Sequence, residues 1–371
     1  MAKTPQVVVV GAGIIGCAVA YELARHGARV RVIDRRAVGQ GATQASAGVL
    51  APFLSAHEGR PLVELGARSL GLFDEFVARV VEDSGAPVQY VRSGTLEVAL
   101  TDAALVRLQA TAQACSANGA RCDLLDATGV RRVEKQLSPR IVGGLLVHSH
   151  GFVGAVELAG ALQRAAGAHG VRFVSSTAAA RVTRRRGGLR VELAGDSIAC
   201  DRVVLAAGSW SGQVEVDGAP ATPVRPVRGQ ILHLGWPASR LSRVIWSPEC
   251  YLVPWNDGSV LAGATVEDVG FDERATVNGV QHLLAMTRDI VPEAGAAWFR
   301  AVRVGLRPGT PDELPVVGRS VSLPGLVYAT GHYRNGILLA PLTAAIVARL
   351  VLEDDEDPAI SAMTPTRFGA C

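Results

Sequence analysis

The chain has 371 residues, 49% of which are hydrophobic, and its formal net charge is +3. The length and apolar content predict one large or two ordinary domains, and the small net charge argues against a nucleic acid partner. The six cysteines show no CxxC spacing, so we expect no metal site, no disulfide framework and a reducing compartment.

The first predicted element is a nucleotide-binding strand, turn and helix at VVVVGAGIIG. The apolar run leads into Gly11, Gly13 and Gly16, and an apolar helical pattern follows at Ala18, Tyr21, Leu23 and Ala24. The first glycine permits a tight turn, the second lets the backbone approach a pyrophosphate, and the third lets helix and strand pack closely. Backbone N–H groups at the helix N-terminus would then face the phosphates.

The next predicted strand, ARVRVID, ends at Asp34, where a carboxylate can accept hydroxyls of an adenosine ribose. Arg35 and Arg36 leave a 2′-phosphate, and so NADP, as an alternative, but the charge of Asp34 opposes it. The pattern therefore predicts a dinucleotide and leaves NAD and FAD open.

A membrane helix is a competing interpretation of residues 4–21, because this stretch carries no charge. Its β-branched start and its three glycines favour a strand and a turn instead. No basic segment followed by a cleavage signal is visible either. We therefore expect a soluble, cytoplasmic protein.

After Asp34, the sequence RRAVGQGATQASAGVLAP is rich in small residues that let the backbone approach a flat, bulky group, and a helix is predicted at about residues 61–81. Two later strands, within residues 202–212 and 326–336, also end in glycine. Three such strands far apart in the sequence indicate one nucleotide domain made of separated pieces. We assign residues 1–86, 146–221 and 301–371 to an FAD-binding or NAD-binding domain and residues 87–145 and 222–300 to a substrate domain.

The motifs GAGIIG, SAGVLAP, AAGSWSG, PVRGQ, CYLVP, GLRPGTPDELPVVG and GHYRNGILLAP follow in this order over about residues 7–352. Together they resemble the FAD-dependent amine oxidases of the D-amino-acid oxidase and sarcosine oxidase group, most closely its glycine oxidase branch in thiamine thiazole biosynthesis. The resemblance implies an α/β fold: a discontinuous Rossmann-type FAD domain plus an α+β substrate domain with a large mixed sheet. It also implies a homo-oligomer, a tetramer. No cysteine lies in residues 326–341, where monomeric sarcosine oxidases link their flavin, so we expect non-covalent FAD.

The resemblance also implies the roles of individual residues. Arg307 would hold the substrate carboxylate with its planar guanidinium, Tyr251 would add a hydrogen bond, and Arg334 would lie at the substrate end of the flavin. Backbone N–H groups at a helix start near Gly336 would stabilise negative charge on the reduced flavin. The implied cofactor-binding residues are Gly11, Gly13, Ile14, Ile15, Gly16, Asp34, Arg35, Ala42, Thr43, Ala47, Gly48, Val49, Ala179, Gly208, His332, Tyr333, Arg334, Asn335, Gly336, Ile337 and Leu338.

Without the resemblance, the same residues have plainer interpretations. Tyr251 would be a buried strand aromatic, and Arg307 would form an ion pair with Asp312 or Glu313. His332 and Arg334 would lie in solvent beside a helix cap. A bulky indole at Trp255 would either narrow the pocket entrance or cover the sheet.

The implied reaction is oxidation of a small amino acid such as glycine, sarcosine or D-alanine by hydride transfer to flavin N5, with no dedicated general base. Water would hydrolyse the imine to the 2-oxo acid and ammonia, and O2 would be reduced to H2O2. Two alternatives stay open. One is a D-amino-acid or D-hydroxyproline dehydrogenase that passes electrons to a quinone or protein acceptor, and the other is a flavin-binding protein without turnover.

Overall fold

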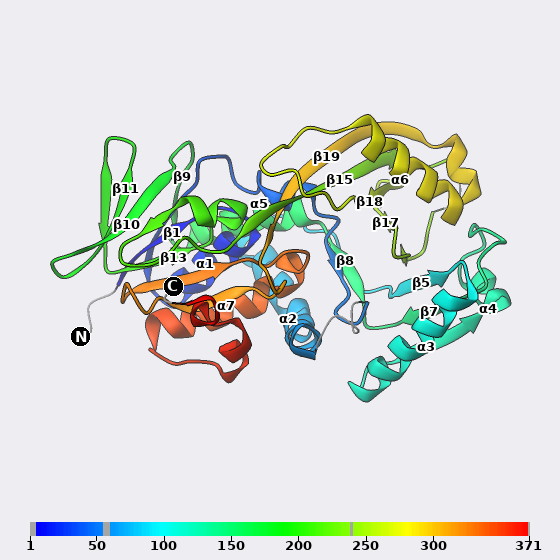
Figure 1. Cartoon of the computed structure of the whole chain (residues 1–371), viewed down its shortest axis with the longest axis horizontal. Helices are drawn as coiled ribbons and strands as arrows, with labels where there is room; N and C mark the ends of the chain where they lie inside the picture. Colours follow the sequence, from blue (N-terminus) through cyan, green and yellow to red (C-terminus); the bar gives the residue numbers. More distant parts are fainter. Residues whose placement is uncertain (1–4, 55–59, 238–239, 370–371) are drawn as a thin grey trace.

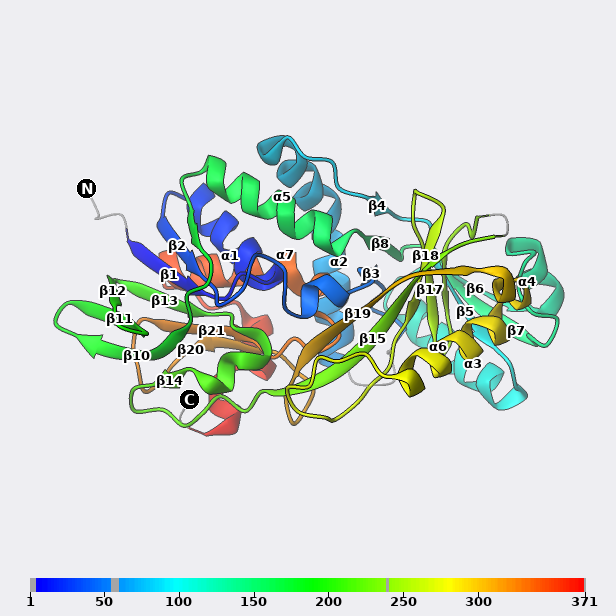
Figure 2. The ribbon, with the colours of Figure 1, turned by 90° about the horizontal axis from the view of Figure 1, so that it is seen from above.

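The computed structural model describes residues 5–54, 60–237 and 240–369, which form two parts lying side by side (Figure 1). One part is built on a six-stranded sheet and the other on an eight-stranded sheet. The long strands β15 (Arg225–Gly235) and β19 (Trp298–Gly309) pair with each other and run from the first part into the second (Figure 2).

The six-stranded sheet is parallel except for one edge strand. In spatial order its strands are β20 (Val316–Arg319), β21 (Leu326–Thr330), β13 (Arg202–Leu205), β1 (Gln6–Val10), β2 (Arg29–Ile33) and β9 (Arg172–Val174). Only β20 pairs antiparallel with its neighbour. Alternate valines of β1 point to opposite faces, so Val7 and Val9 join one buried cluster and Val8 and Val10 another.

Helices cover one face of this sheet, and a smaller sheet covers the other. The helices are α1 (Ile14–Arg25), α2 (Arg60–Ser84), α5 (Ala155–Ala168) and α7 (Gly336–Leu352). The small sheet consists of β12 (Ser197–Cys200), β11 (Gly188–Leu193), β10 (Ala179–Arg185) and β14 (Glu215–Val216). Helix α7 is apolar over nearly its whole length because it packs against both α1 and α2.

The first turns of α7 are adapted to a proline. Pro341 lies inside the helix and has no N–H to donate. Ser69 of α2 supports the neighbouring turn, because its hydroxyl donates to the Leu338 carbonyl (2.6 Å) and accepts the Leu342 N–H (3.3 Å). The start of α7 is therefore held against α2 by polar contacts as well as apolar ones.

The eight-stranded sheet is mixed, since only β16 and β5 pair in parallel. In spatial order it contains β19, β15, β18 (Ser259–Gly263), β17 (Tyr251–Pro254), β16 (Val244–Trp246), β5 (Thr95–Ala99), β7 (Gly143–Val147) and β6 (Cys122–Asp126). Helices α3 (Asp102–Ala117), α4 (Ala127–Val133) and α6 (Val277–Ile290) pack on it. A three-stranded sheet of β3 (Val49–Leu50), β8 (Gly151–Val153) and β4 (Tyr90–Val91) lies between the two parts.

The predicted strand, helix and strand at the N-terminus are confirmed as β1, α1 and β2, and the helix expected at about residues 61–81 is α2. The division into domains stays a prediction, and two of its boundaries fall inside strands. Position 145/146 lies within β7 and 300/301 within β19, and both strands belong to the eight-stranded sheet. No helix in the described residues has the length and apolar content to cross a membrane.

Candidate active site

A cavity of about 380 Å³ lies between the six-stranded and the eight-stranded sheets. Its wall combines the C-terminal ends of β1, β2, β13 and β21 with β17 and β19, so segments far apart in the sequence meet there. This is the edge at which open α/β sheets bind their ligands. The predicted residues that line it are Gly11, Gly13, Ile14, Ile15, Asp34, Arg35, Ala42, Thr43, Ala47, Gly48, Val49, Ala179, Gly208, Tyr251, Arg307, His332, Tyr333, Arg334, Gly336 and Ile337.

Three predicted cofactor residues do not line the cavity. Gly16 lies in the first turn of α1, where an added Cβ would come within 1.9 Å of the Gly11 carbonyl oxygen. It therefore provides the close packing expected of the third glycine. Asn335 is the residue before α7, and Leu338 is buried in the helical core.

The three glycines of the fingerprint differ in what surrounds them. Gly11 has a φ of +112°, and a Cβ there would lie 2.3 Å from the Ala206 carbonyl oxygen, so both conformation and space require glycine. A Cβ on Gly13 would meet nothing closer than Thr43 Oγ1, at 3.7 Å. The backbone at Gly13 is therefore open to the cavity at the N-terminus of α1, where N–H groups and the helix dipole favour an anion.

Asp34 is held in a fixed orientation at the end of β2. The Ala12 N–H donates to its Oδ2 (2.6 Å), and the Arg36 N–H donates to its Oδ1 (2.8 Å). The carboxylate is thereby tied to the glycine turn and still lines the cavity. This arrangement suits the ribose contact that the sequence predicts.

At the other end of the cavity, Arg307 extends from β19. Its Nη1 donates to the carbonyl oxygens of Thr265 (2.9 Å) and Arg228 (3.3 Å), and both acceptors are neutral. The ion pair with Asp312 does not form, because Asp312 is bound by Arg367 at 2.7 Å. Burial lowers the pKa of Arg307, and the positive charge of Arg334 lowers it further. An arginine still stays protonated, so a half-buried positive charge faces the cavity.

Tyr251 on β17 lies in the same wall as Arg307. Its ring stacks on Trp246 of the paired strand β16, with centroids 5.0 Å apart and planes at 14°. Burial raises the pKa of the Tyr251 hydroxyl, and the Arg307 charge opposes that shift. The phenol therefore stays a neutral hydrogen-bonding group at neutral pH.

The loop that leads into α7 carries one charged side chain and one neutral one. Arg334 is exposed, and its guanidinium lies over the Tyr333 ring, 5.1 Å from the centroid. His332 is buried, with Nε2 3.0 Å from Thr343 Oγ1 of α7, and burial lowers its pKa to about 3. His332 is thus a neutral structural group rather than a second cation in solvent.

Sequence reasoning missed several lining residues of the substrate end. Trp246 lines the cavity, whereas Trp255, to which the sequence drew attention, does not and packs in an apolar cluster with Val253 and Leu261. The sequence pattern that could have predicted Trp246 is the pair of apolar runs VIW and YLV on either side of SPEC, which is typical of a β-hairpin. In the structure this hairpin pairs Trp246 with Tyr251. Gly229, also in the wall, lies in the motif PVRGQ.

Comparison with known proteins identifies the family. Residues 6–350 match the family described as DAO, FAD dependent oxidoreductase. The chain belongs to this family. A glycine oxidase from Geobacillus kaustophilus is 31% identical over 93% of this chain and 92% of its own length. A crystal structure of glycine oxidase from the same organism superposes with a TM-score of 0.93, covering 98% of this chain and 99% of that one.

A second relative is longer than this chain. The protein named bifunctional ThiO/ThiG, from Synechocystis, is 34% identical over 99% of this chain. The chain spans 55% of that relative's length, so about half of the relative has no counterpart here.

The residues of the nucleotide end fit FAD, the cofactor of this family. Gly13 leaves the backbone open at the start of α1, and Asp34 is oriented toward the same space. A Cβ at Gly48 would lie 1.7 Å from the Val153 carbonyl, so this small-residue segment lies tightly against β8 beside the cavity. Gly11, Gly13, Asp34, the segment around Thr43 to Val49 and the start of α7 would hold the dinucleotide.

Proposed function

We propose that this chain catalyses the oxidative deamination of glycine and other small amino acids. The observation that carries the proposal is the half-buried guanidinium of Arg307, which lines the cavity at the end farther from the nucleotide fingerprint. Its hydrogen-bond acceptors are two backbone carbonyls, and none of the carboxylates in the described ranges pairs with it. A buried cation needs an anionic partner, and a substrate carboxylate offers two oxygens that match the guanidinium fork.

When bound, FAD would supply the redox chemistry, a two-electron oxidation of the amine with O2 as the final acceptor. The residues of this chain bind and orient the substrate. Arg307 holds the carboxylate, and the Tyr251 hydroxyl donates a second hydrogen bond to it. The acidic residues in the described cavity wall are Asp34, which is bound to the glycine turn, and the exposed Glu249. The Glu249 carboxylate lies 4.0 Å from His282, and we propose that no side chain acts as general base and that the amine reacts in its neutral form.

The overall reaction is glycine, water and O2 giving glyoxylate, ammonia and H2O2. The stacked pair of Trp246 and Tyr251 fills one side of the cavity beside Arg307, which favours small side chains over large ones. The glycine oxidase relatives support glycine as the first substrate to test.

The experiment is a substrate panel of glycine, sarcosine, D-alanine, D-proline, L-alanine and D-phenylalanine, scored by H2O2 release and by the 2-oxo acid formed. We expect glycine to be used and bulky amino acids to react poorly. Reduction of an artificial dye without any O2 consumption would instead establish the dehydrogenase alternative. A best substrate with an aromatic side chain would contradict the proposed substrate class.

We also propose non-covalent FAD, a homo-oligomer, a cytoplasmic location and a role in thiamine thiazole biosynthesis. Cys250 lines the cavity, but burial raises its thiol pKa to about 12, which leaves it a poor nucleophile for a flavin link. Release of the flavin by acid precipitation tests the first proposal, and light scattering of the purified protein tests the second.

A further inference from the structure

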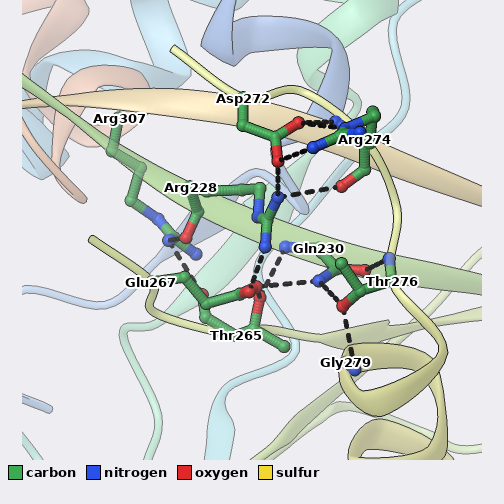
Figure 3. A network of polar contacts seen from close by, with 9 residues as sticks. All are labelled: Arg228, Gln230, Thr265, Glu267, Asp272, Arg274, Thr276, Gly279 and Arg307. Carbon is green, nitrogen blue, oxygen red and sulfur yellow. Dashed lines mark hydrogen bonds and ion pairs between the residues drawn. The ribbon is translucent and has the colours of Figure 1, made fainter. Parts of the chain in front are cut away.

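The two carbonyls that hold Arg307 belong to residues whose side chains meet at one carboxylate (Figure 3). Glu267 accepts a hydrogen bond from Arg228 Nη2 at its Oε2 (2.5 Å) and from Thr265 Oγ1 at its Oε1 (2.6 Å). Arg228 and Thr265 therefore present their carbonyl oxygens to Arg307 while Glu267 holds their side chains.

The network around Glu267 is tightly built. Gln230 donates to Glu267 Oε1 (2.8 Å), and its backbone N–H donates to Thr265 Oγ1 (2.9 Å). Arg228 and Glu267 also form a two-way backbone bridge, with N–O distances of 2.9 and 3.0 Å. The Arg228 side chain is 4% exposed, and Asp272 supplies its second carboxylate at 3.0 Å.

Stability alone does not explain such a network. A buried ion pair loses much of its attraction to desolvation, and apolar residues of similar volume stabilise a fold as well or better. A network of this kind is explained by what it positions, since each hydrogen bond fixes an angle as well as a distance. Arg307 is hydrogen-bonded to two residues of this network and also lines the cavity, so it is the side chain that the network can position.

We propose that Glu267 is a positioning residue that, through Arg228 and Thr265, fixes the guanidinium of Arg307 for the substrate carboxylate. This inference rests on the proposed function. Glu267 does not touch the substrate. It sets the two carbonyls that occupy Nη1, so that the remaining N–H groups of Arg307 face the cavity in one orientation.

Gly229, between Arg228 and Gln230 on β15, completes the arrangement. A Cβ at this position would lie 2.4 Å from Arg307 Nη1 and 2.5 Å from its Cζ. The guanidinium thus lies directly on bare backbone, and the space it fills exists only because residue 229 is glycine. Gly229 does not have a positive φ, so alanine suits the strand itself and would displace only the flexible end of Arg307.

The test uses the FAD-bound protein and acetate as a simple carboxylate probe, with binding followed by the perturbation of the flavin absorption spectrum. We expect the acetate Kd to rise about tenfold in Gly229→Ala and in Glu267→Ala, the effect of losing roughly one charge-assisted hydrogen bond. Glu267→Gln should give a smaller rise, because its amide oxygen still accepts hydrogen bonds. FAD content should match the unaltered protein in all three.

Asp268→Asn is the matched control. Asp268 adjoins Glu267 and pairs with Arg225 of the same strand β15 at 2.5 Å, but the pair is exposed and has no contact with Arg307. Its acetate Kd should stay within about twofold of the unaltered protein, as expected for a surface ion pair.

A merely structural role for Glu267 would lower the Tm of Glu267→Ala and leave the acetate Kd unchanged, and that result would overturn the proposal. If Glu267→Ala does not fold, Glu267→Gln decides, since an acetate Kd equal to that of the unaltered protein in that variant also overturns the proposal. Failure of the unaltered protein to bind acetate would instead count against the proposed function of Arg307.

Discussion

At the nucleotide end of the cavity, the wall consists mainly of glycine turns, the Asp34 carboxylate and the start of a helix, whereas the other end carries single side chains on different strands. Gly11, Gly13 and Asp34 lie within one strand, helix and strand unit. Arg307 and Tyr251 come from β19 and β17, which are brought together by a sheet with long-range pairings. The first end is therefore built to hold a dinucleotide of fixed shape, and the second can change its ligand by changing a few side chains.

The largest effect is expected from a substitution that fills the nucleotide end of the cavity and leaves the fold intact. Gly13→Leu places a side chain in the open space at the start of α1, where an added Cβ meets nothing closer than 3.7 Å. We expect purified protein without flavin and without activity, but with an unchanged circular dichroism spectrum. Gly16→Ala should instead destabilise the fold. Its added Cβ would lie 1.9 Å from the Gly11 carbonyl oxygen, so we expect this variant to have a lower Tm. Yellow, active Gly13→Leu protein would contradict this assignment.

Substitutions at the Arg307 end of the cavity should have the opposite effect: FAD stays bound, and substrate binding weakens. Arg307→Ala or Arg307→Lys should keep FAD and raise the KM for glycine, because a bidentate charge-assisted pair worth on the order of 2–4 kcal/mol is lost. Steady-state kinetics together with the flavin spectrum measure both properties. Amine oxidation that survives either change within about threefold would show that the carboxylate is held elsewhere.

The loop between the two ends predicts a pH effect on stability. Burial holds the pKa of His332 at about 3, below its unfolded value of about 6.5, so between these values the unfolded chain binds a proton that the folded protein does not. The free energy of unfolding should therefore fall as the pH falls from about 6.5, by up to about 1.4 kcal/mol per unit from this residue.

Thermal unfolding of the unaltered protein and of His332→Gln between about pH 7 and pH 4.5 checks this effect. The variant should be less stable at neutral pH because it disturbs a packed site, but its Tm should depend less steeply on pH. Parallel slopes would show that His332 is not the titrating group.

The smallest effect is expected at Tyr251. Tyr251→Phe removes the hydroxyl and keeps the ring that stacks on Trp246, so the loss is limited to one hydrogen bond of about 1 kcal/mol. The KM for glycine should rise by about fivefold with FAD retained. A change as large as that of Arg307→Ala would place the main carboxylate contact on Tyr251.

The sequence allowed the glycine turn and the strand end before Asp34 to be predicted closely, because their signals are local. The glycine spacing and the position of Asp34 specify the turn and the strand end without reference to the rest of the chain. The substrate end depended on the family resemblance, since nothing within GLRPGT shows that Arg307 meets the carbonyls of Arg228 and Thr265, 79 and 42 positions away.

Two other features depended on long-range packing. His332 looked like a cation near solvent, but the core of α7 buries it as a neutral group. The expected domain boundaries near 145 and 300 fall inside β7 and β19, because both strands are held in the eight-stranded sheet by pairing with strands distant in the sequence. Neither the burial of His332 nor the pairing of these strands can be predicted from the residues next to them in the sequence.

The most direct test of the account is to mix the FAD-bound protein with glycine in the absence of oxygen and follow the visible flavin absorption. The account predicts that the absorption is lost as the amine is oxidised, and that Arg307→Ala needs far more glycine for the same loss. An unchanged spectrum with glycine and with every amino acid of the panel would contradict the proposal that this cavity oxidises small amino acids.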